Sequence, residues 1–200
     1  GWAELFCYYP VLARLLATTF LNWVETTSAF LRRMDSDLVD IRRQFFSGRD
    51  LGEIHLLQPG LSDPHDGGRS GVIVTFRSGE RLVYKPAAQE LEAAYRRLLD
   101  WLDEADCPVE FRSPTVLDRG DYGWAEFIDH RPCASIQDGP VYYRRLGGLL
   151  CLGYILNAID MHFENVVACG DQPVPIDLET IFHPTLPIDE LDDPDPASVA

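Results

Sequence analysis

The sequence predicts an α+β fold in which a helical segment precedes a β-rich domain. Apolar residues recur at helical spacing through residues 10–33, which indicates a long amphipathic helix. Residues 36–46 predict a second helix that stops at Gly48. From residue 51 the chain changes to short runs of branched and aromatic residues, which are typical of strands. We therefore expect residues 1–50 to be a helical scaffold, or one wall of a groove.

The β-rich portion predicts a sheet with one helix, followed by a second helix and a hairpin. The expected elements are strands at 53–57, 72–76 and 81–84, a helix at 88–105, strands at 115–118 and 124–128, a helix at 141–157, and strands at 166–168 and 174–176. The helix at 141–157 is apolar almost throughout, so we expect it to be buried. A glycine-rich polar loop at 60–71 separates the first two strands.

Composition excludes several classes of function. The 200 residues carry 17 basic and 32 acidic side chains, a formal charge of −15, which argues against nucleic acid or an anionic membrane as partner. The five cysteines are scattered and form no Cys-x-x-Cys pair, so we expect buried thiols in a reducing, cytoplasmic compartment and no zinc site. No apolar run is long enough for a transmembrane segment. Because the chain begins with Gly1 and stops in an acidic, proline-rich stretch, we expect a fragment of a longer protein.

One segment carries a pattern used in phosphoryl transfer. The apolar helix is followed by Asp160, four intervening residues and Asn165, after which a β-rich stretch begins. Phosphoryl transfer needs an acid that orients or deprotonates the attacking hydroxyl and an amide oxygen that holds Mg²⁺ beside the phosphates. Kinase catalytic loops have the same Asp-x-x-x-x-Asn interval.

The expected hairpin brings a second possible metal ligand to this segment. Asp177 follows the hairpin, where a kinase places its metal-binding Asp. Asn165 and Asp177 at the open end of one hairpin can together hold a hard cation whose other positions are filled by phosphate and water. Glu179 adds a carboxylate on the same side, two positions along an extended chain.

A lysine completes the kinase-like order of elements. Lys85 ends a strand and precedes a helix, where a kinase keeps the Lys that neutralises the α- and β-phosphates. The helix normally supplies a glutamate partner for this Lys, and both Glu90 and Glu92 are candidates. Each feature is common by itself, whereas the succession of loop, Lys, helix, Asp, Asn, hairpin and Asp predicts a kinase-like domain.

Four motifs resemble the dehydratase domain of class II lanthipeptide synthetases (LanM type). In chain order they are Ser62-Asp63-Pro64-His65-Asp66-Gly67-Gly68-Arg69, Val83-Tyr84-Lys85-Pro86, Asp160-Met161-His162-Phe163-Glu164-Asn165 and Pro175-Ile176-Asp177-Leu178-Glu179-Thr180. The resemblance implies a lipid-kinase-like two-lobe fold, with residues 51–132 as the N-lobe and 133–200 as the start of a truncated C-lobe. The chain departs from the family pattern at two positions: Ser62 stands where the family has Gly, and Gly71 stands where the family usually has a branched residue.

The resemblance also implies an activity. The domain would use ATP and Mg²⁺ to phosphorylate Ser and Thr of a leader-bearing precursor peptide, and would then eliminate phosphate to give dehydroamino acids. By resemblance, Lys85, Gly68 and Arg69 would contact the nucleotide phosphates, and Asp160 would act on the substrate hydroxyl. Asn165 and Asp177 would bind the metal. Asp63 and His65 would order the phosphate loop, while His162 and Glu179 would support the active site.

Two other functions stay open from the sequence. One is a general kinase-like phosphotransferase for a small substrate, against which His162 and Glu179 argue because they distinguish the motifs from those of ordinary kinases. The other is a non-catalytic nucleotide- or peptide-binding fragment in which the carboxylates are structural. The groups that the family uses for elimination, and its cyclase domain, are expected beyond this chain, so we expect the isolated fragment to be incomplete or inactive.

Overall fold

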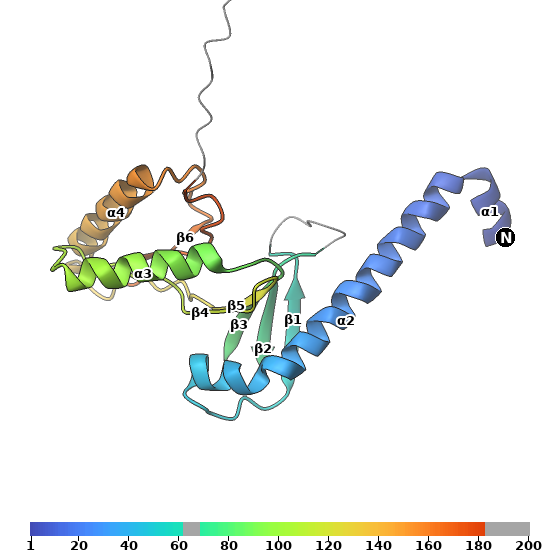
Figure 1. Cartoon of the computed structure of the whole chain (residues 1–200), viewed down its shortest axis with the longest axis horizontal. Coiled ribbons are helices and arrows are strands. Elements are labelled where there is room, and N and C mark those ends of the chain that lie inside the picture. Colours follow the sequence, from blue (N-terminus) through green and yellow to red (C-terminus); the bar gives the residue numbers. More distant parts are fainter. Residues whose placement is uncertain (62–68, 183–200) are drawn as a thin grey trace, which may run out of the picture.

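The computed structural model describes residues 1–61 and 69–182, and its elements are labelled in Figure 1. In chain order they are α1 (Trp2–Tyr8), α2 (Pro10–Phe46), β1 (Ile54–Pro59), β2 (Val72–Phe76), β3 (Arg81–Lys85), α3 (Glu90–Glu104), β4 (Val116–Asp118), β5 (Gly123–Glu126), α4 (Asp138–Ile155), β6 (Val166–Cys169) and β7 (Gln172–Pro175). The predicted α+β class and the expected order of strands and helices are confirmed.

Helix α2 is continuous, so the prediction of two helices divided before residue 36 is wrong. Its buried residues include Phe30, Met34, Asp37 and Ile41, a spacing of three and four that continues one face through the expected break. Asp35 and Ser36 lie on the exposed side, where they do not interrupt the helix. The helix ends at Ser47, whose φ of 53° is left-handed and breaks the helical path.

The main sheet has the strand order β1-β2-β3-β5-β4, and its described neighbours are all antiparallel. The C-terminal half of α2 packs against this sheet. The shared core consists of Phe30, Met34, Ile41 and Phe46 from the helix, Leu51 from the turn after it, and Val74, Phe76, Leu82, Tyr84 and Trp124 from the strands. Helix α2 is therefore anchored by one half only.

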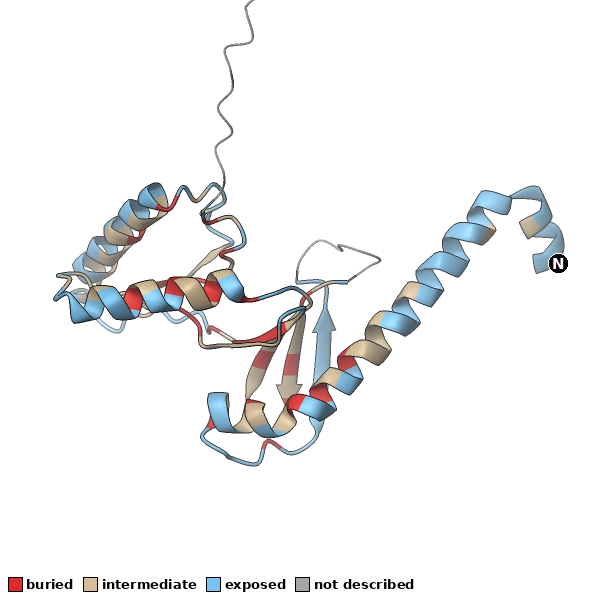
Figure 2. Cartoon of the chain, in the orientation of Figure 1, coloured by how far each residue is buried: buried red, intermediate tan, exposed pale blue. Residues whose placement is uncertain are grey.

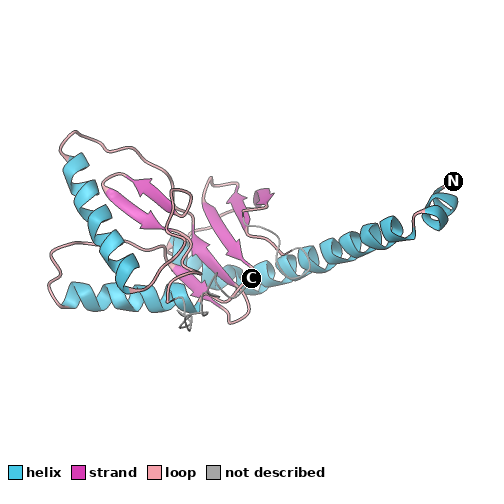
Figure 3. Ribbon diagram, turned by 90° about the horizontal axis from the view of Figure 1, so that it is seen from above, coloured by secondary structure: helices cyan, strands magenta, loops and turns pink. Residues whose placement is uncertain are grey.

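The N-terminal half of α2 extends away from the strands (Figure 1) and is exposed along its length (Figure 2). Its exposed apolar side chains include Leu15, Phe20 and Trp23, which are 55%, 62% and 61% exposed. The apolar stripe predicted for this stretch is present, but within the described residues nothing covers most of it. Figure 3 shows the same helix running away from both sets of strands.

A second core joins α3 to the segments that follow α4 and β7. Tyr95 and Leu99 of α3 pack with Leu156, just after α4, and with Leu178 and Ile181, after β7. Hairpin β6–β7 pairs Val166 with Pro175 and Cys169 with Gln172. The second core therefore brings to α3 the two segments that the sequence predicted to act in phosphoryl transfer, namely those that contain Asp160 and Asp177.

The prediction that the apolar helix at 141–157, which corresponds to α4, is buried is wrong. Leu149 is the only buried residue of α4, while Leu150 and Tyr154 are 75% and 88% exposed. One side of α4 meets the 109–111 segment, since a Cβ at Gly148 would lie 2.9 Å from Phe111 Cζ. Helix α4 also contacts β7, and its Leu152 packs against the second core, yet Leu150 and Tyr154 stay exposed, so apolar content alone did not determine burial. No helix within residues 1–61 and 69–182 is long and apolar enough to cross a bilayer.

Candidate active site

Lys85 is held at the point where the main sheet meets α3 and the hairpin. Its Nζ donates to Glu92 Oε1 at 3.0 Å and to the Ile176 carbonyl oxygen at 3.2 Å. The Lys85 side chain is 17% exposed and that of Glu92 is 8% exposed, so the ion pair is largely removed from water. Of the two glutamates that the sequence left open, the structure selects Glu92, because Glu90 is exposed. Glu92 shares the inward face of α3 with Tyr95.

A glycine allows α3 to approach the strand that carries this lysine. Lys85 is paired with Gly123 in β5. A Cβ at Gly123 would lie 2.3 Å from Gln89 Cγ and 2.9 Å from the Leu117 carbonyl oxygen. Gln89 is 1% exposed and stands at the N-cap of α3, with its backbone N–H donating to Asp118 Oδ1 at 3.1 Å. Any larger residue at position 123 would push the start of α3 away from Lys85.

The Asp160–Asn165 loop closes on itself through the asparagine. Asn165 Nδ2 donates to the Asp160 carbonyl oxygen at 2.9 Å and to Asp160 Oδ2 at 3.3 Å. The Ile176 N–H donates to the Asn165 carbonyl oxygen at 3.0 Å, which extends the hairpin register by one pair. Ile176 thus joins the two segments, because its N–H bonds to Asn165 and its carbonyl oxygen accepts from Lys85 Nζ.

His162 lies against the carboxylate of Asp160. Its Nδ1 accepts the Glu164 N–H at 3.1 Å, which places the proton of a neutral imidazole on Nε2. Nε2 lies 3.3 Å from Asp160 Oδ1. The imidazole therefore lies beside one carboxylate oxygen of Asp160, while the Asn165 amide donates to the other.

Asn165 and Asp177 each have a side-chain oxygen of the kind that a hard cation binds. The Asn165 amide nitrogen is used on Asp160, so Oδ1 is the atom that this side chain can offer a metal. Asp177 Oδ1 accepts the Glu179 N–H at 3.4 Å, and its other oxygen is available as a ligand. No three His, Cys, Asp or Glu residues cluster as a metal site within the described residues. Two oxygen ligands suit Mg²⁺, which usually keeps several waters and binds substrate phosphates.

Comparison with known proteins gives the relationship. The family described as "Domain of unknown function (DUF4135)" matches residues 9–199. The chain belongs to the DUF4135 family. The lacticin 481/lactococcin biosynthesis protein LcnDR2 of Lactococcus lactis subsp. lactis is 35% identical over 129 residues, which cover 60% of this chain and 14% of that protein. The resemblance to class II lanthipeptide synthetases predicted from the motifs is thereby confirmed, while this chain spans a small part of the relative's length.

The glycine-rich loop of this DUF4135 chain is only partly described. Asp63, His65 and Gly68 were predicted to order the loop or contact phosphate, and they lie outside the described residues. Arg69 is described and exposed, and it lines a hollow together with Tyr84 and Pro86, the two chain neighbours of Lys85. The roles predicted for these residues stay predictions.

Sequence reasoning missed the polar network that fixes α2 of the DUF4135 chain to the sheet. Asp37 is 4% exposed and accepts hydrogen bonds from Tyr122 Oη and Trp124 Nε1, both at 2.8 Å, and from Arg119 Nε at 3.0 Å. Burial, and then the hydrogen bond to Asp37, raises the pKa of Tyr122 to about 12. The hydrogen bond from Arg119 lowers the pKa of Asp40, the partly exposed neighbour of this network. A charged residue inside the apolar stripe of α2 was the available signal, because a buried charge needs partners.

A second link joins α2 to the lysine strand. Arg33 donates to Tyr84 Oη at 2.6 Å and to Asp121 Oδ2 at 2.5 Å, and its guanidinium lies 4.1 Å from the centre of the Tyr122 ring. Tyr84 directly precedes Lys85 in β3. The helix and the lysine strand are therefore connected by side-chain hydrogen bonds as well as by apolar packing.

Proposed function

We propose that this DUF4135 domain acts in lanthipeptide biosynthesis, as the kinase-like part of an enzyme that phosphorylates Ser and Thr in a precursor peptide with ATP and Mg²⁺. The observation that carries the proposal is the position of Lys85 Nζ, 3.0 Å from Glu92 Oε1 and 3.2 Å from the carbonyl oxygen before Asp177. The relationship to a lacticin 481/lactococcin biosynthesis protein supports the pathway class. The proposal includes the two-lobe arrangement, with the main sheet and α3 in one lobe and α4 with the hairpin in the other.

The choice of cation at position 85 supports phosphate binding. Lys85 is the only lysine among the 17 Lys and Arg residues of the chain. A lysine ammonium binds phosphate as a compact point charge, whereas an arginine guanidinium binds phosphates and carboxylates through two parallel hydrogen bonds. The arginines of this chain make such carboxylate pairs, for example Arg112 with Glu126 and Arg119 with Asp37.

In the proposed reaction each residue has one task. Glu92 orients Lys85, whose ammonium binds oxygens of the α- and β-phosphates. Asn165 and Asp177 hold Mg²⁺, which supplies neutralisation of phosphate charge. Asp160 orients the substrate hydroxyl and accepts its proton as the oxygen attacks the terminal phosphorus and ADP leaves. The His162 Nε2–H keeps the carboxylate of Asp160 in position.

Phosphate elimination is the second part of the proposal. The phosphorylated Ser or Thr loses a proton and phosphate to become dehydroalanine or dehydrobutyrine. We assign this step to the whole enzyme and to no residue of this chain. The five cysteines are free, which suits the reducing cytoplasm where we place the reaction. The prediction that these thiols are buried is correct for Cys169 and wrong for Cys7, Cys133 and Cys151, which are exposed, and for Cys107, which is partly exposed.

Phosphopeptide formation tests the proposal. The full natural chain is incubated with Mg-ATP and a Ser/Thr-rich precursor peptide, and phosphopeptide is measured by mass spectrometry. Asp160→Asn should lower its rate of formation by about 100-fold or more, the usual contribution of a general base. The matched control Asp103→Asn changes an exposed carboxylate at the end of α3 and should leave the rate unchanged.

Three results would count against the proposal, and two of them would support another function. Equal phosphopeptide from wild type and Asp160→Asn would remove the assignment of Asp160. Phosphorylation of small alcohols in preference to the peptide would favour a small-substrate phosphotransferase, and absence of Mg-ATP binding by calorimetry would favour a non-catalytic module.

A further inference from the structure

We propose that the hollow between α2 and the main sheet is a docking groove for an extended peptide segment that carries apolar and acidic side chains. This inference rests on the proposed function, because the segment is taken to be part of the peptide substrate outside the Ser or Thr that is phosphorylated. The groove has a volume of about 560 Å³. Its walls come from α2 on one side and from β1, β2 and β3 on the other.

The groove forms where α2 leaves the sheet. Phe30 is 5% exposed and belongs to the shared core, while Trp23, two turns earlier on the same face, is 61% exposed. Between them the helix separates from the strands, as Figure 1 shows. The opposite wall includes Leu57 and Pro59 of the edge strand β1. The space is therefore bounded by aromatic and aliphatic side chains that can receive apolar anchors of a peptide.

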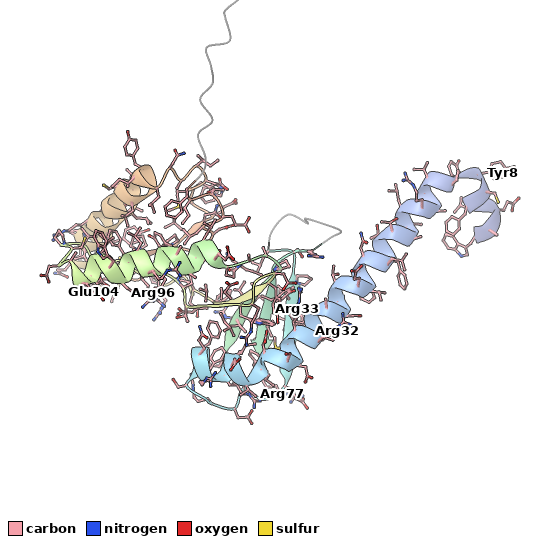
Figure 4. The ribbon with its side chains drawn as sticks, in the orientation of Figure 1. Tyr8, Arg32, Arg33, Arg77, Arg96 and Glu104 are labelled. Atoms are coloured by element: carbon pink, nitrogen blue, oxygen red, sulfur yellow. The ribbon has the colours of Figure 1, made fainter. Side chains whose placement is uncertain are left out.

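Cations gather in this groove although the chain is strongly acidic. Arg32, Arg33 and Arg69 line it, and Glu25 is the only acidic residue among its described lining. Figure 4 shows Arg32 and Arg33 on the stretch of α2 beside the strands. Arg33 is paired with Asp121, whereas Arg32 and Arg69 have no carboxylate partner within residues 1–61 and 69–182. A local positive charge in a chain of formal charge −15 favours a partner that brings carboxylates.

The position of the groove links it to the proposed chemistry. Tyr84 and Pro86 line the groove, and Lys85 lies between them in the chain with its side chain turned to Glu92 and Ile176. A peptide held along α2 would thus run beside the strand end that presents the phosphate-binding lysine. Binding energy from a remote part of a substrate can position its reacting group, so docking here would raise the local concentration of the acceptor residue.

A peptide fits this space better than a folded partner does. A stable interface between folded proteins needs about 800 Å² on each side. A concave space of about 560 Å³ instead accommodates a few side chains of an extended chain. A second copy of this chain would have to insert a projecting segment, and this alternative is distinguished by the experiment below.

The test is peptide binding without nucleotide, using the full natural chain. The probes are three short fluorescein-labelled peptides of identical Leu, Ser and Gly content that carry Glu, Gln or Lys at the same positions. We expect affinity measured by anisotropy to fall in the order Glu, Gln, Lys. Arg32→Glu should weaken binding of the Glu peptide about tenfold, which is the loss expected when one charged contact is removed. The same substitution should improve binding of the Lys peptide.

Matched controls use the same substitutions away from the groove. Arg14→Glu reverses a charge on the exposed half of α2, and Trp101→Ala removes an exposed indole from α3. Both should leave affinity for the Glu peptide unchanged, while Trp23→Ala should weaken it about tenfold, because truncation of a central aromatic anchor is costly. Circular dichroism confirms that each variant is folded. A photo-crosslinking residue at position 23 should label the Glu peptide, and one at position 101 should not.

Failure of the groove and failure of the proposed function give different results. Equal affinity for the three peptides, or groove variants that behave like their controls, would overturn the groove while leaving Mg-ATP binding and Asp160-dependent phosphorylation intact. Loss of self-association in Trp23→Ala, measured by sedimentation, would show that a second copy occupies the groove and would also overturn it. Absence of Mg-ATP binding by the wild type would instead remove the proposed function, on which the assignment of the peptide as substrate depends.

Discussion

Replacement of Glu92 by Gln tests the ion pair that holds Lys85. The substitution keeps the size of the side chain and removes its charge, so the Lys85 ammonium loses its carboxylate partner while the helix is unchanged. Glu90→Gln is the matched control, because Glu90 lies in the same first turn of α3 but is exposed. The sequence alone could not distinguish the two glutamates.

The magnitude follows from the geometry. At the observed 3.0 Å, two unit charges attract by about 5 kcal/mol if the effective dielectric constant is about 20. Much of this is offset by the desolvation of both groups, whose side chains are only 17% and 8% exposed. We take a net effect of about 2 kcal/mol on the placement of the ammonium, which corresponds to about 30-fold in rate.

The assay is the initial rate of phosphopeptide formation at subsaturating ATP and peptide. We expect kcat/KM of Glu92→Gln to fall about 30-fold, and that of Glu90→Gln to stay within about twofold of wild type. If the two variants have equal kcat/KM, Glu92 does not position Lys85 and the reasoning from the ion pair is wrong. Comparison of KM for ATP with KM for peptide shows which substrate is affected. The weaker placement of Lys85 should change KM for ATP only.

Three further substitutions test how the structure supports the site. Asp37→Ala leaves the buried Trp124 indole N–H and Arg119 Nε without their acceptor, and should lower the free energy of unfolding by about 3–5 kcal/mol in urea titrations. Asp40→Ala removes a more exposed carboxylate and should cost much less; similar losses would refute a special role for the buried carboxylate. Gly123→Ala should lower the same free energy by about 1–3 kcal/mol because its Cβ meets backbone and side-chain atoms, while Gly139→Ala, with open space around it, should be neutral or stabilising; the reverse order would contradict the packing. Burial and the bond to Asp37 raise the pKa of Tyr122 to about 12, so this phenol contributes stability that is present below pH about 10 and is lost as pH rises through about 12. The free energy of unfolding of the wild type should thus fall more steeply than that of Tyr122→Phe across this window. Parallel curves for the two proteins would exclude this contribution of Tyr122.

Local features of the fold were predictable where short-range pattern and tertiary environment agree. The strand 72–76 was placed correctly because branched residues alternate between core and partly covered positions on a sheet. The helix after Lys85 was found from its apolar spacing. By contrast, the continuity of α2 depends on Met34 packing against the sheet, whereas the sequence pattern predicted that a second helix begins at residue 36.

Burial and partners were less predictable because they depend on which segments meet. The residues of α4 are apolar in composition, yet contact with Phe111 on one side gives only one buried residue. Lys85, Asn165 and Asp177 were expected to meet from the order of their motifs, and Lys85 does reach the residue before Asp177. The acceptor there is a backbone carbonyl of Ile176, which no side-chain pattern can reveal. The choice of Glu92 likewise required knowing which face of α3 is turned inward.

Labelling of the single lysine tests the central claim most directly. An acyl phosphate of ATP transfers its acyl group to a lysine amine near bound phosphates, releasing ATP, and Lys85 is the only lysine in this chain. The account predicts acylation of Lys85, identified by peptide mass mapping, that excess Mg-ATP suppresses and that Asp177→Asn weakens. Acylation that Mg-ATP does not reduce, or none above that of an unrelated amine, would show that no nucleotide binds at this lysine.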